Sequence, residues 1–406
     1  MLCAMDTVWI VVGAAIILVT MVDTFLSVLN YNERGLVVNR VARWTWVTLR
    51  VGTRRLSAGT HQTALRRSTG LITVAMIFTW LLGVLLGFAL VYFGAMGAGA
   101  IKVDPGAPQG FWAALYMSIG QFSTVGVENI SSVHPLIDYL TVIQALSSVV
   151  LLSMIVAFLL NVFSGIQALR SLCADFARPA EGDGAVLAPL YPYFPGGAAI
   201  DVERYLTTTV SDMNAYGDVL RQTRTTYYFQ SGDEQFSAPY ALISVSTMVG
   251  ALRWGFPVGS TPVSRLPGLF RLEESLSAAR RWISDEMLHL PDAAAPPPLS
   301  EAAFAAQWKR CREQEYPDGV DPYVAGFDSL CRAAARLTSP SRSDEAVADA
   351  DVAEAYARYV EWLPFGWVSE RFNVAVSRDL DFRPRDRAYT SRPFDPRGVA
   401  QALPPA

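Results

Sequence analysis

The residues with the clearest chemical potential form a short run, Ser123-Thr124-Val125-Gly126. Their chemistry is that of the backbone, because carbonyl oxygens held toward one point replace the hydration shell of an alkali cation. Gly126 suits such a site, since glycine adopts a positive φ at little cost and lets the backbone approach a ligand closely. The run therefore predicts a path for monovalent cations lined by the carbonyls of Thr124, Val125 and Gly126.

The segment before this run predicts the element that positions it. Residues 111–130 read FWAALYMSIGQFSTVGVENI, with about ten residues of apolar helical pattern followed by small residues. The helix is too short to cross a bilayer, which takes about 20 apolar residues. Non-helical backbone at membrane depth is tolerated only where protein buries it or water lines it. We expect a re-entrant half-helix whose C-terminal carbonyls favour a cation.

Three apolar stretches are long enough to cross a membrane: about residues 7–29, 71–96 and 136–163. The charged fraction of the chain is 17%, well below the roughly 25% of soluble domains. The alternative for the first stretch is a secretory signal peptide, but it lacks a basic leading region. The composition thus predicts a multi-pass protein of the plasma, or cell inner, membrane.

Arginine sets the expected orientation. Residues 31–70 hold eight arginines and one acid, Glu33. The positive-inside rule places this linker in the cytoplasm, the N-terminus outside and everything after Arg170 inside. Trp44 and Trp46 among the arginines favour an amphipathic helix, within residues 34–67, lying on anionic lipids over a plain solvated connector.

Span, half-helix, Thr-Val-Gly and span together resemble the two-span pore module of potassium channels, over residues 71–165. The residues that carry the resemblance are Trp112, Ala114, Leu115, Tyr116 and Ser118 in the half-helix and Ser123, Thr124, Val125 and Gly126 after it. The resemblance implies a homotetramer, K⁺ as the permeant ion, and a filter of Thr124, Val125, Gly126 and Val127. The opposing interpretation is an ordinary outside loop between two anchor helices.

This sequence departs from the family after Gly126. The family continues with Tyr-Gly-Asp, whereas this chain continues with Val127-Glu128-Asn129. Glu128 stands where glycine takes a positive φ, which costs another residue roughly 1 kcal/mol or changes the local backbone. Glu128 and Asn129 are expected at the outer mouth, where four Glu128 carboxylates would attract cations.

The third span is expected to line the pore. It lacks a glycine between residues 136 and 163, so Ser147 and Ser148 are the candidate bending point, with close helix packing as the alternative. Asn161 is expected either to line the inner mouth or to bond a neighbouring helix.

The remaining chain predicts a mostly helical cytosolic domain over about residues 170–380 and a disordered tail over 381–406. The expected divisions before it are an N-terminal span (1–30), the basic linker (31–70) and the pore module (71–165). Residues 239–252 are apolar but too short for a fourth span, which favours a buried helix. The fold class is an all-α membrane protein.

The sequence thus predicts a potassium-channel-like cation channel subunit with a cytosolic regulatory domain and no cofactor beyond the permeant ion. A basic strip beside apolar spans points to membrane lipids and not to nucleic acid. No nucleophile–base pair, metal-ligand cluster or nucleotide motif is visible, so an enzyme is not expected. The alternative is a channel-derived membrane scaffold or sensor that does not conduct.

Overall fold

The structure is a computed structural model that describes residues 4–29, 35, 37–53, 64–65, 67–106, 108–176, 185–229, 234–313, 319–338 and 352–382. It divides into two compact units. Unit 1 comprises Met1–Ile166 and Val219–Phe229, and unit 2 comprises Gln167–Asp218 and Gln230–Ala406. Residues 219–229 pack within unit 1, apart from their neighbours in the sequence.

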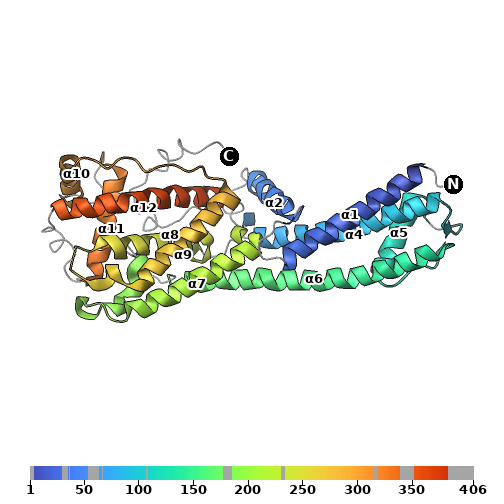
Figure 1. The fold of residues 1–406 in the computed structure, drawn as a ribbon, viewed down its shortest axis with the longest axis horizontal. Helices are drawn as coiled ribbons and strands as arrows, with labels where there is room; N and C mark the ends of the chain where they lie inside the picture. The colour runs from blue at the N-terminus through green and yellow to red at the C-terminus, as the bar shows by residue number, and fades with distance from the viewer. Residues whose placement is uncertain are drawn as a thin grey trace. The chain divides into compact units, whose positions relative to one another are not determined.

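Unit 1 contains three helices long and apolar enough to span a membrane, as the composition predicts. They belong to α1 (Ala4–Leu29), α4 (Ser68–Gly97) and α6 (Pro135–Ala174) (Figure 1). The third helix continues beyond the predicted end at residue 163, because the polar residues that follow keep a helical pattern. A small antiparallel sheet, β1 (Ile101–Val103) with β2 (Ile130–Ser132), was not expected in an all-α fold.

Helices α1 and α4 lie side by side because glycines bring their backbones together (Figure 1). A Cβ on Gly13 of α1 would come within 2.5 Å of the Gly87 carbonyl oxygen of α4. Gly83 and Gly94 of α4 have equally close neighbours on α1. Since apolar surface gains little by leaving lipid, such close contact between small residues is how spans associate.

Asp23 is the acid that interrupts the first span, and it is buried and bonded. Its carboxylate accepts hydrogen bonds from the indole N–H of Trp80 on α4, at 3.0 Å, and from the backbone N–H of Val37, at 2.8 Å. The carboxylate therefore fixes the start of the next helix, α2 (Val38–Thr53), against the α1–α4 pair.

Residues 219–229 join unit 1 through the short helix η3 (Arg224–Tyr228). The Tyr228 ring packs on Trp46 of α2 with centroids 5.4 Å apart, and its carbonyl accepts a bond from Ser68 at the start of α4. On α6, a Cβ at Gly165 would collide with Thr226. This segment thus contacts α2, the start of α4 and α6.

Unit 2 is helical in its described part, as predicted. Its longer elements are α7 (Val202–Gln222), α8 (Ala238–Gly250), α9 (Pro267–Ile283), α10 (Glu301–Glu313), α11 (Pro322–Thr338) and α12 (Val352–Asp379). Shorter turns complete it: η1 (Ala185–Tyr193), η2 (Pro195–Gly197), η4 (Glu234–Phe236), η5 (Ala251–Gly255), η6 (Pro262–Arg265) and η7 (Ser284–Leu288). The apolar run 239–252 forms α8 and part of η5, and it is almost wholly buried. The predicted disordered tail lies outside the described residues from 383 onward.

Aromatic rings form the core of unit 2. Phe304 and Trp308 of α10 stack with centroids 5.3 Å apart, and Phe304 also stacks on Tyr359 of α12 at 4.9 Å. Phe327 of α11 contacts Tyr359 and Trp362. Helix α12 also contributes the buried rings of Trp362 and Phe372 to this core.

A carboxyl group is also buried in this unit, and no ion pair joins it to another described residue. Glu370 of α12 is 9% exposed, and burial raises the pKa of its carboxyl to about 8. Burial, and after it the charge of the nearby Glu370 carboxylate, raises the pKa of the Tyr323 hydroxyl on α11. Helix α8, which also packs on α12, carries no charged residue, and Arg253 of η5 pairs with Glu273 instead. Burial therefore favours the protonated form of Glu370 in the folded protein.

We predict that Glu370→Gln removes a pH dependence of stability. Between the ordinary carboxyl pKa near 4.5 and about 8, the folded state binds a proton that the unfolded state has released, so stability falls as pH rises. The slope is at most about 1.4 kcal/mol per pH unit. Thermal unfolding of the full-length protein in detergent at pH 6, 7 and 8 measures it, and the variant should gain stability over wild type toward pH 8.

The matched control is Glu361→Gln, since Glu361 is exposed on the same helix. A control curve that follows wild type, with a flatter Glu370→Gln curve, is the expected pair of results. Parallel curves for wild type and Glu370→Gln would show that Glu370 is already ionised in the folded protein.

Candidate functional site

The loop between α4 and α6 leaves and returns at the same end of α4. Its helix, α5 (Phe111–Phe122), begins beside Phe93 of α4, and the centroids of the Phe111 and Phe93 rings are 6.0 Å apart. Eight residues deeper in α4, the Leu85 carbonyl accepts a 2.8 Å hydrogen bond from Ser118. At 1.5 Å per residue, the loop descends about 12 Å along α4. It then returns to β2, and Val133 bonds the Ala100 carbonyl just beyond the end of α4.

A buried polar network holds α5 at this depth. Gln144 of α6 donates to the Ser118 carbonyl at 2.9 Å and to its hydroxyl at 3.0 Å. The hydroxyl of Tyr92 on α4 donates to the Gln144 carbonyl oxygen at 2.7 Å. All three side chains are buried. The network joins α4, α5 and α6, so it fixes the half-helix between the two spans that flank it.

Sequence reasoning noted Ser118 and missed Tyr92 and Gln144. The available signal was an amide within an otherwise apolar span, since polar side chains in spans usually face other helices and hydrogen-bond them. Its partners could not be named, because they lie 26 and 52 residues away in the chain.

The predicted filter residues follow α5 directly, and two of them have a positive φ. Thr124 has φ +63° and Gly126 has φ +77°, whereas Val125 and Val127 do not adopt positive φ. For Gly126 this conformation is inexpensive, but for threonine it costs roughly 1–2 kcal/mol. Strain of this kind persists only where the surrounding structure imposes it, and it is common at functional sites.

Hydrogen bonds from this segment back to α5 orient its carbonyls. The N–H of Thr124 bonds the Gln121 carbonyl at 3.1 Å, and the N–H of Gly126 bonds the Gly120 carbonyl at 3.0 Å. In a trans peptide the C=O points opposite to the N–H. The carbonyls of Ser123 and Val125 are therefore directed away from α5.

The Gly126 carbonyl is placed differently. A Cβ at Gly120 would come within 3.0 Å of it, so it lies beside α5 in the single chain. Because Gly120 has no side chain, the Val127 side chain also fits against it. A Cβ at Gly120 would lie 2.6 Å from Cγ1 of Val127. Three carbonyls were expected to line an ion path. Of these, the Val125 carbonyl points away from α5, whereas the Gly126 carbonyl lies beside α5.

None of the carbonyls of residues 124–127 accepts a hydrogen bond from the described part of the chain. Backbone carbonyls are strong acceptors that folded proteins pair almost without exception when they are buried. The Val125 side chain is 85% exposed, so this segment lies on the surface of the single chain. The arrangement offers several oxygen acceptors that need a partner from outside the chain.

Beyond Val127 the chain returns to the strand pair. Glu128 does not adopt a positive φ. Its side chain is exposed, as is that of Asn129. The Asn129 carbonyl accepts a bond from the N–H of Asp104, which belongs to the strand pair. The loop thus closes two residues after Val127, with Glu128 at its exposed end.

The three candidate residues of α6 occupy different environments. Ser148 is buried and bonds its own helix at the Ala145 carbonyl, 2.7 Å away, while Ser147 is half-buried. Asn161 is half-buried, and its amide donates to the Val28 carbonyl of α1 at 3.4 Å. Of the two roles expected for Asn161, the bond to a neighbouring helix is therefore present in this chain.

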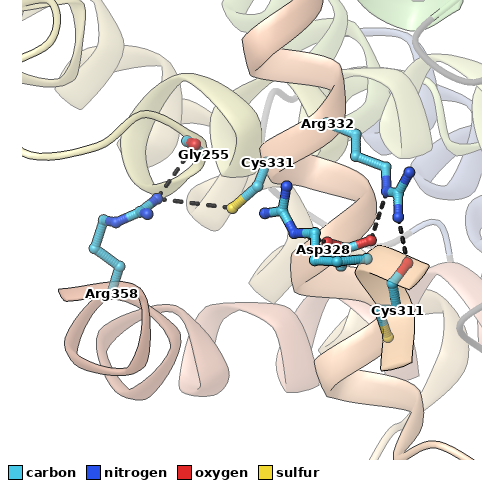
Figure 2. Close-up of polar contacts among 7 residues, drawn as sticks. Gly255, Cys311, Asp328, Cys331, Arg332 and Arg358 are labelled. Carbon is cyan, nitrogen blue, oxygen red and sulfur yellow. Dashed lines mark hydrogen bonds and ion pairs between the residues drawn. The ribbon is translucent and has the colours of Figure 1, made fainter. Parts of the chain in front are cut away.

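A second concentration of reactive residue types lies in unit 2 (Figure 2). Asp328 of α11 pairs with Arg312 of α10, at 2.9 Å, and with Arg332 of α11, at 2.7 Å. Arg332 also donates to the Cys311 carbonyl. The nearby Arg358 of α12 donates to the carbonyls of Trp254 and Gly255 and contacts the Cys331 sulfur at 3.7 Å.

These contacts join the helices of unit 2 to one another. Burial raises the pKa of both thiols, Cys311 and Cys331, to about 11, so they are protonated at neutral pH. A protonated thiol is a poor nucleophile. The carboxylate is held by two guanidinium groups, the pattern of a structural buried ion pair. This network supports the packing of α10, α11, α12 and η5.

Comparison of the chain with protein-family models, with curated proteins and with solved structures finds no match.

We predict that Gln144→Leu loosens the half-helix. Leucine is similar in size but leaves the Tyr92 hydroxyl and the Ser118 carbonyl without their partner, and each buried group left unbonded costs about 1–3 kcal/mol. Thermal unfolding of the full-length protein in detergent should show a lowered midpoint. The matched control is Gln167→Leu, at an exposed position of the same helix. Equal midpoints for both variants would show that the network does not hold α5.

Proposed function

We propose that the chain is a subunit of a potassium-channel-like cation channel that conducts K⁺ across the plasma, or cell inner, membrane. The observation that carries the proposal is a half-helix bonded between two long apolar helices and followed by carbonyls, at residues 124–127, that accept no hydrogen bond from the described residues. A loop of this kind is tolerated in a membrane only where protein or water covers it. A water-filled pore provides that cover, and a permeant K⁺ provides the missing partner for the carbonyls.

A single chain supplies one wall of such a pore, so the proposal requires several copies. Exposed apolar side chains support assembly: Trp112, Tyr116 and Ile119 form one exposed stripe along α5. On α6 the buried positions follow a seam with alternating steps of three and four: Gln144, Ser148, Leu151, Ile155, Phe158 and Val162. The other faces of α6 remain exposed and apolar. We propose a homotetramer, in which neighbouring copies and lipid cover these surfaces.

The orientation proposed is the one that the arginine distribution predicts. The N-terminus and the filter loop lie outside, and unit 2 lies in the cytoplasm as a regulatory domain. The C-terminal end of α5 then places its partial negative charge toward the pore, and four copies together contribute about two elementary charges. Glu128 adds a ring of four carboxylates at the outer mouth.

A specific observation favours the second candidate, a channel-derived scaffold or sensor that does not conduct. The Gly126 carbonyl lies beside α5, and beyond Val127 the chain returns to the strand pair. An ion path built from this chain is therefore shorter than one that continues with Tyr-Gly-Asp. Conduction requires that the Gly126 carbonyl turn toward the pore in the assembled protein.

We predict that Gly126→Val abolishes cation flux in liposomes containing the full-length protein. A branched side chain at φ +77° is strained and blocks the close approach of this backbone to an ion. The control is Gly99→Val, because Gly99 has φ +75° and equally open surroundings but precedes α5 and lies outside residues 124–127. Both variants should run as fourfold oligomers in mild detergent. Flux that is equal in wild type and Gly126→Val would favour the scaffold.

Glu128→Gln should act differently from the glycine variant. It removes four mouth charges while leaving the carbonyls in place, so flux should fall mainly at low ionic strength, where screening is weak. Flux measured at about 10 mM and about 1 M salt tests this, since the Debye length falls from about 30 Å to about 3 Å. A loss that is the same at both concentrations would assign Glu128 a structural role instead.

A further inference from the structure

Helix α2 has two apolar faces, and the structure accounts for one of them. Val38, Ala42 and Trp46 are buried against α4 and η3, with Trp46 on the Tyr228 ring. The three residues are spaced by four, so they occupy one side of the helix. This side fixes α2 to the rest of unit 1.

The other apolar face is exposed. Trp44 is 74% exposed, Val47 is 40% exposed and Val51 is 53% exposed. Spacings of three and four place them on a second side of the helix, which nothing in the described part of unit 1 covers. An exposed tryptophan flanked by aliphatic side chains is unusual at a surface that faces water alone.

The charge of this face restricts what can cover it. Arg40 and Arg43 are exposed one turn before Trp44 and Val47 on the same side of the helix, and residues 37–53 contain no acid. The described acids of unit 1 are Asp6, Asp23, Asp104, Glu128 and Asp138. Asp23 is buried, and the other four lie at or beyond the Gly97 end of α4, whereas α2 packs near its Ser68 end. The described residues of a second copy of unit 1 therefore offer these arginines no exposed acid near the Ser68 end of α4.

We propose that this face of α2 docks on the anionic lipids of the leaflet at the Ser68 end of the spans. Trp44, Val47 and Val51 enter the boundary between headgroups and acyl chains, where tryptophan is favoured. Arg40 and Arg43 bond lipid phosphates at the N-terminal end of the stripe. The proposal needs only that the three apolar helices span a membrane, and it is independent of conduction.

The docking has a structural consequence for the spans. The opposite side of α2 contacts η3, and η3 contacts α6 at Gly165. Lipid bound at the exposed face therefore holds α2, which contacts η3, and η3 in turn contacts α6. If the chain conducts, anionic lipid at this surface should alter the flux.

Two measurements on the full-length protein test the docking. The first is fluorescence quenching in vesicles of brominated phosphatidylglycerol, where the quenched fraction should fall in Trp44→Phe relative to wild type. Trp308→Phe is the control, because Trp308 is buried in unit 2. The second is native mass spectrometry with equal amounts of phosphatidylglycerol and phosphatidylcholine, which counts the retained lipids of each kind.

In the mass spectrometry, Arg40→Gln/Arg43→Gln should lower the ratio of retained anionic to neutral lipid by severalfold. Arg271→Gln/Arg281→Gln, which removes two exposed charges from unit 2, should leave the ratio unchanged. An unchanged quenched fraction in Trp44→Phe would overturn the proposal and assign this face to water or to a protein partner. An equal fall in the ratio for both double variants would show that lipid retention depends only on net charge. That result would also overturn the docking proposal. Neither readout depends on flux, so failure of the channel proposal is separately visible.

Discussion

The arrangement of unit 1 depends on one buried amide, that of Gln144. It bonds the carbonyl and hydroxyl of Ser118 on α5 and accepts the hydroxyl of Tyr92 on α4, so a single side chain connects three helices. A polar group placed among apolar spans is costly unless it is bonded, and that cost makes the arrangement specific. Because α5 is fixed in this way, the segment that follows it also starts between α4 and α6. That segment contains the positive φ of Thr124 and the outward carbonyl of Val125.

The same principle recurs elsewhere in unit 1. Asp23 would be unfavourable in a span, yet its two hydrogen bonds convert it into the point that connects α1, α4 and the start of α2. Glycines complete the arrangement by allowing α1 and α4 to approach at Gly13 and Gly87. In unit 2 aromatic rings fill the interior, and the buried carboxylate of Asp328 is paired with two arginines.

Features that depend on local pattern could be predicted from the sequence. Long apolar runs identify α1, α4 and α6, and an aromatic, amphipathic run identifies α5, because hydrophobic length and periodicity are local properties. The buried character of residues 239–252 follows from a run too short to cross a bilayer. Features that depend on distant contacts were not predicted. The strand pair β1–β2, the Gln144 network and the return of residues 219–229 to unit 1 each join segments tens of residues apart. Backbone direction was also beyond reach, since the Thr-Val-Gly run favours inward carbonyls but does not determine where the Gly126 carbonyl points.

The central claim is that cations bind the backbone of residues 124–127 on the axis of an assembled oligomer. The most direct measurement is the anomalous scattering of Rb⁺ or Tl⁺ in crystals of the full-length protein grown with either ion. The account predicts ion peaks on a fourfold axis, coordinated by carbonyls that include those of Thr124, Val125 and Gly126. An assembled oligomer with no ion at this loop, and with the Gly126 carbonyl still beside α5, would contradict it.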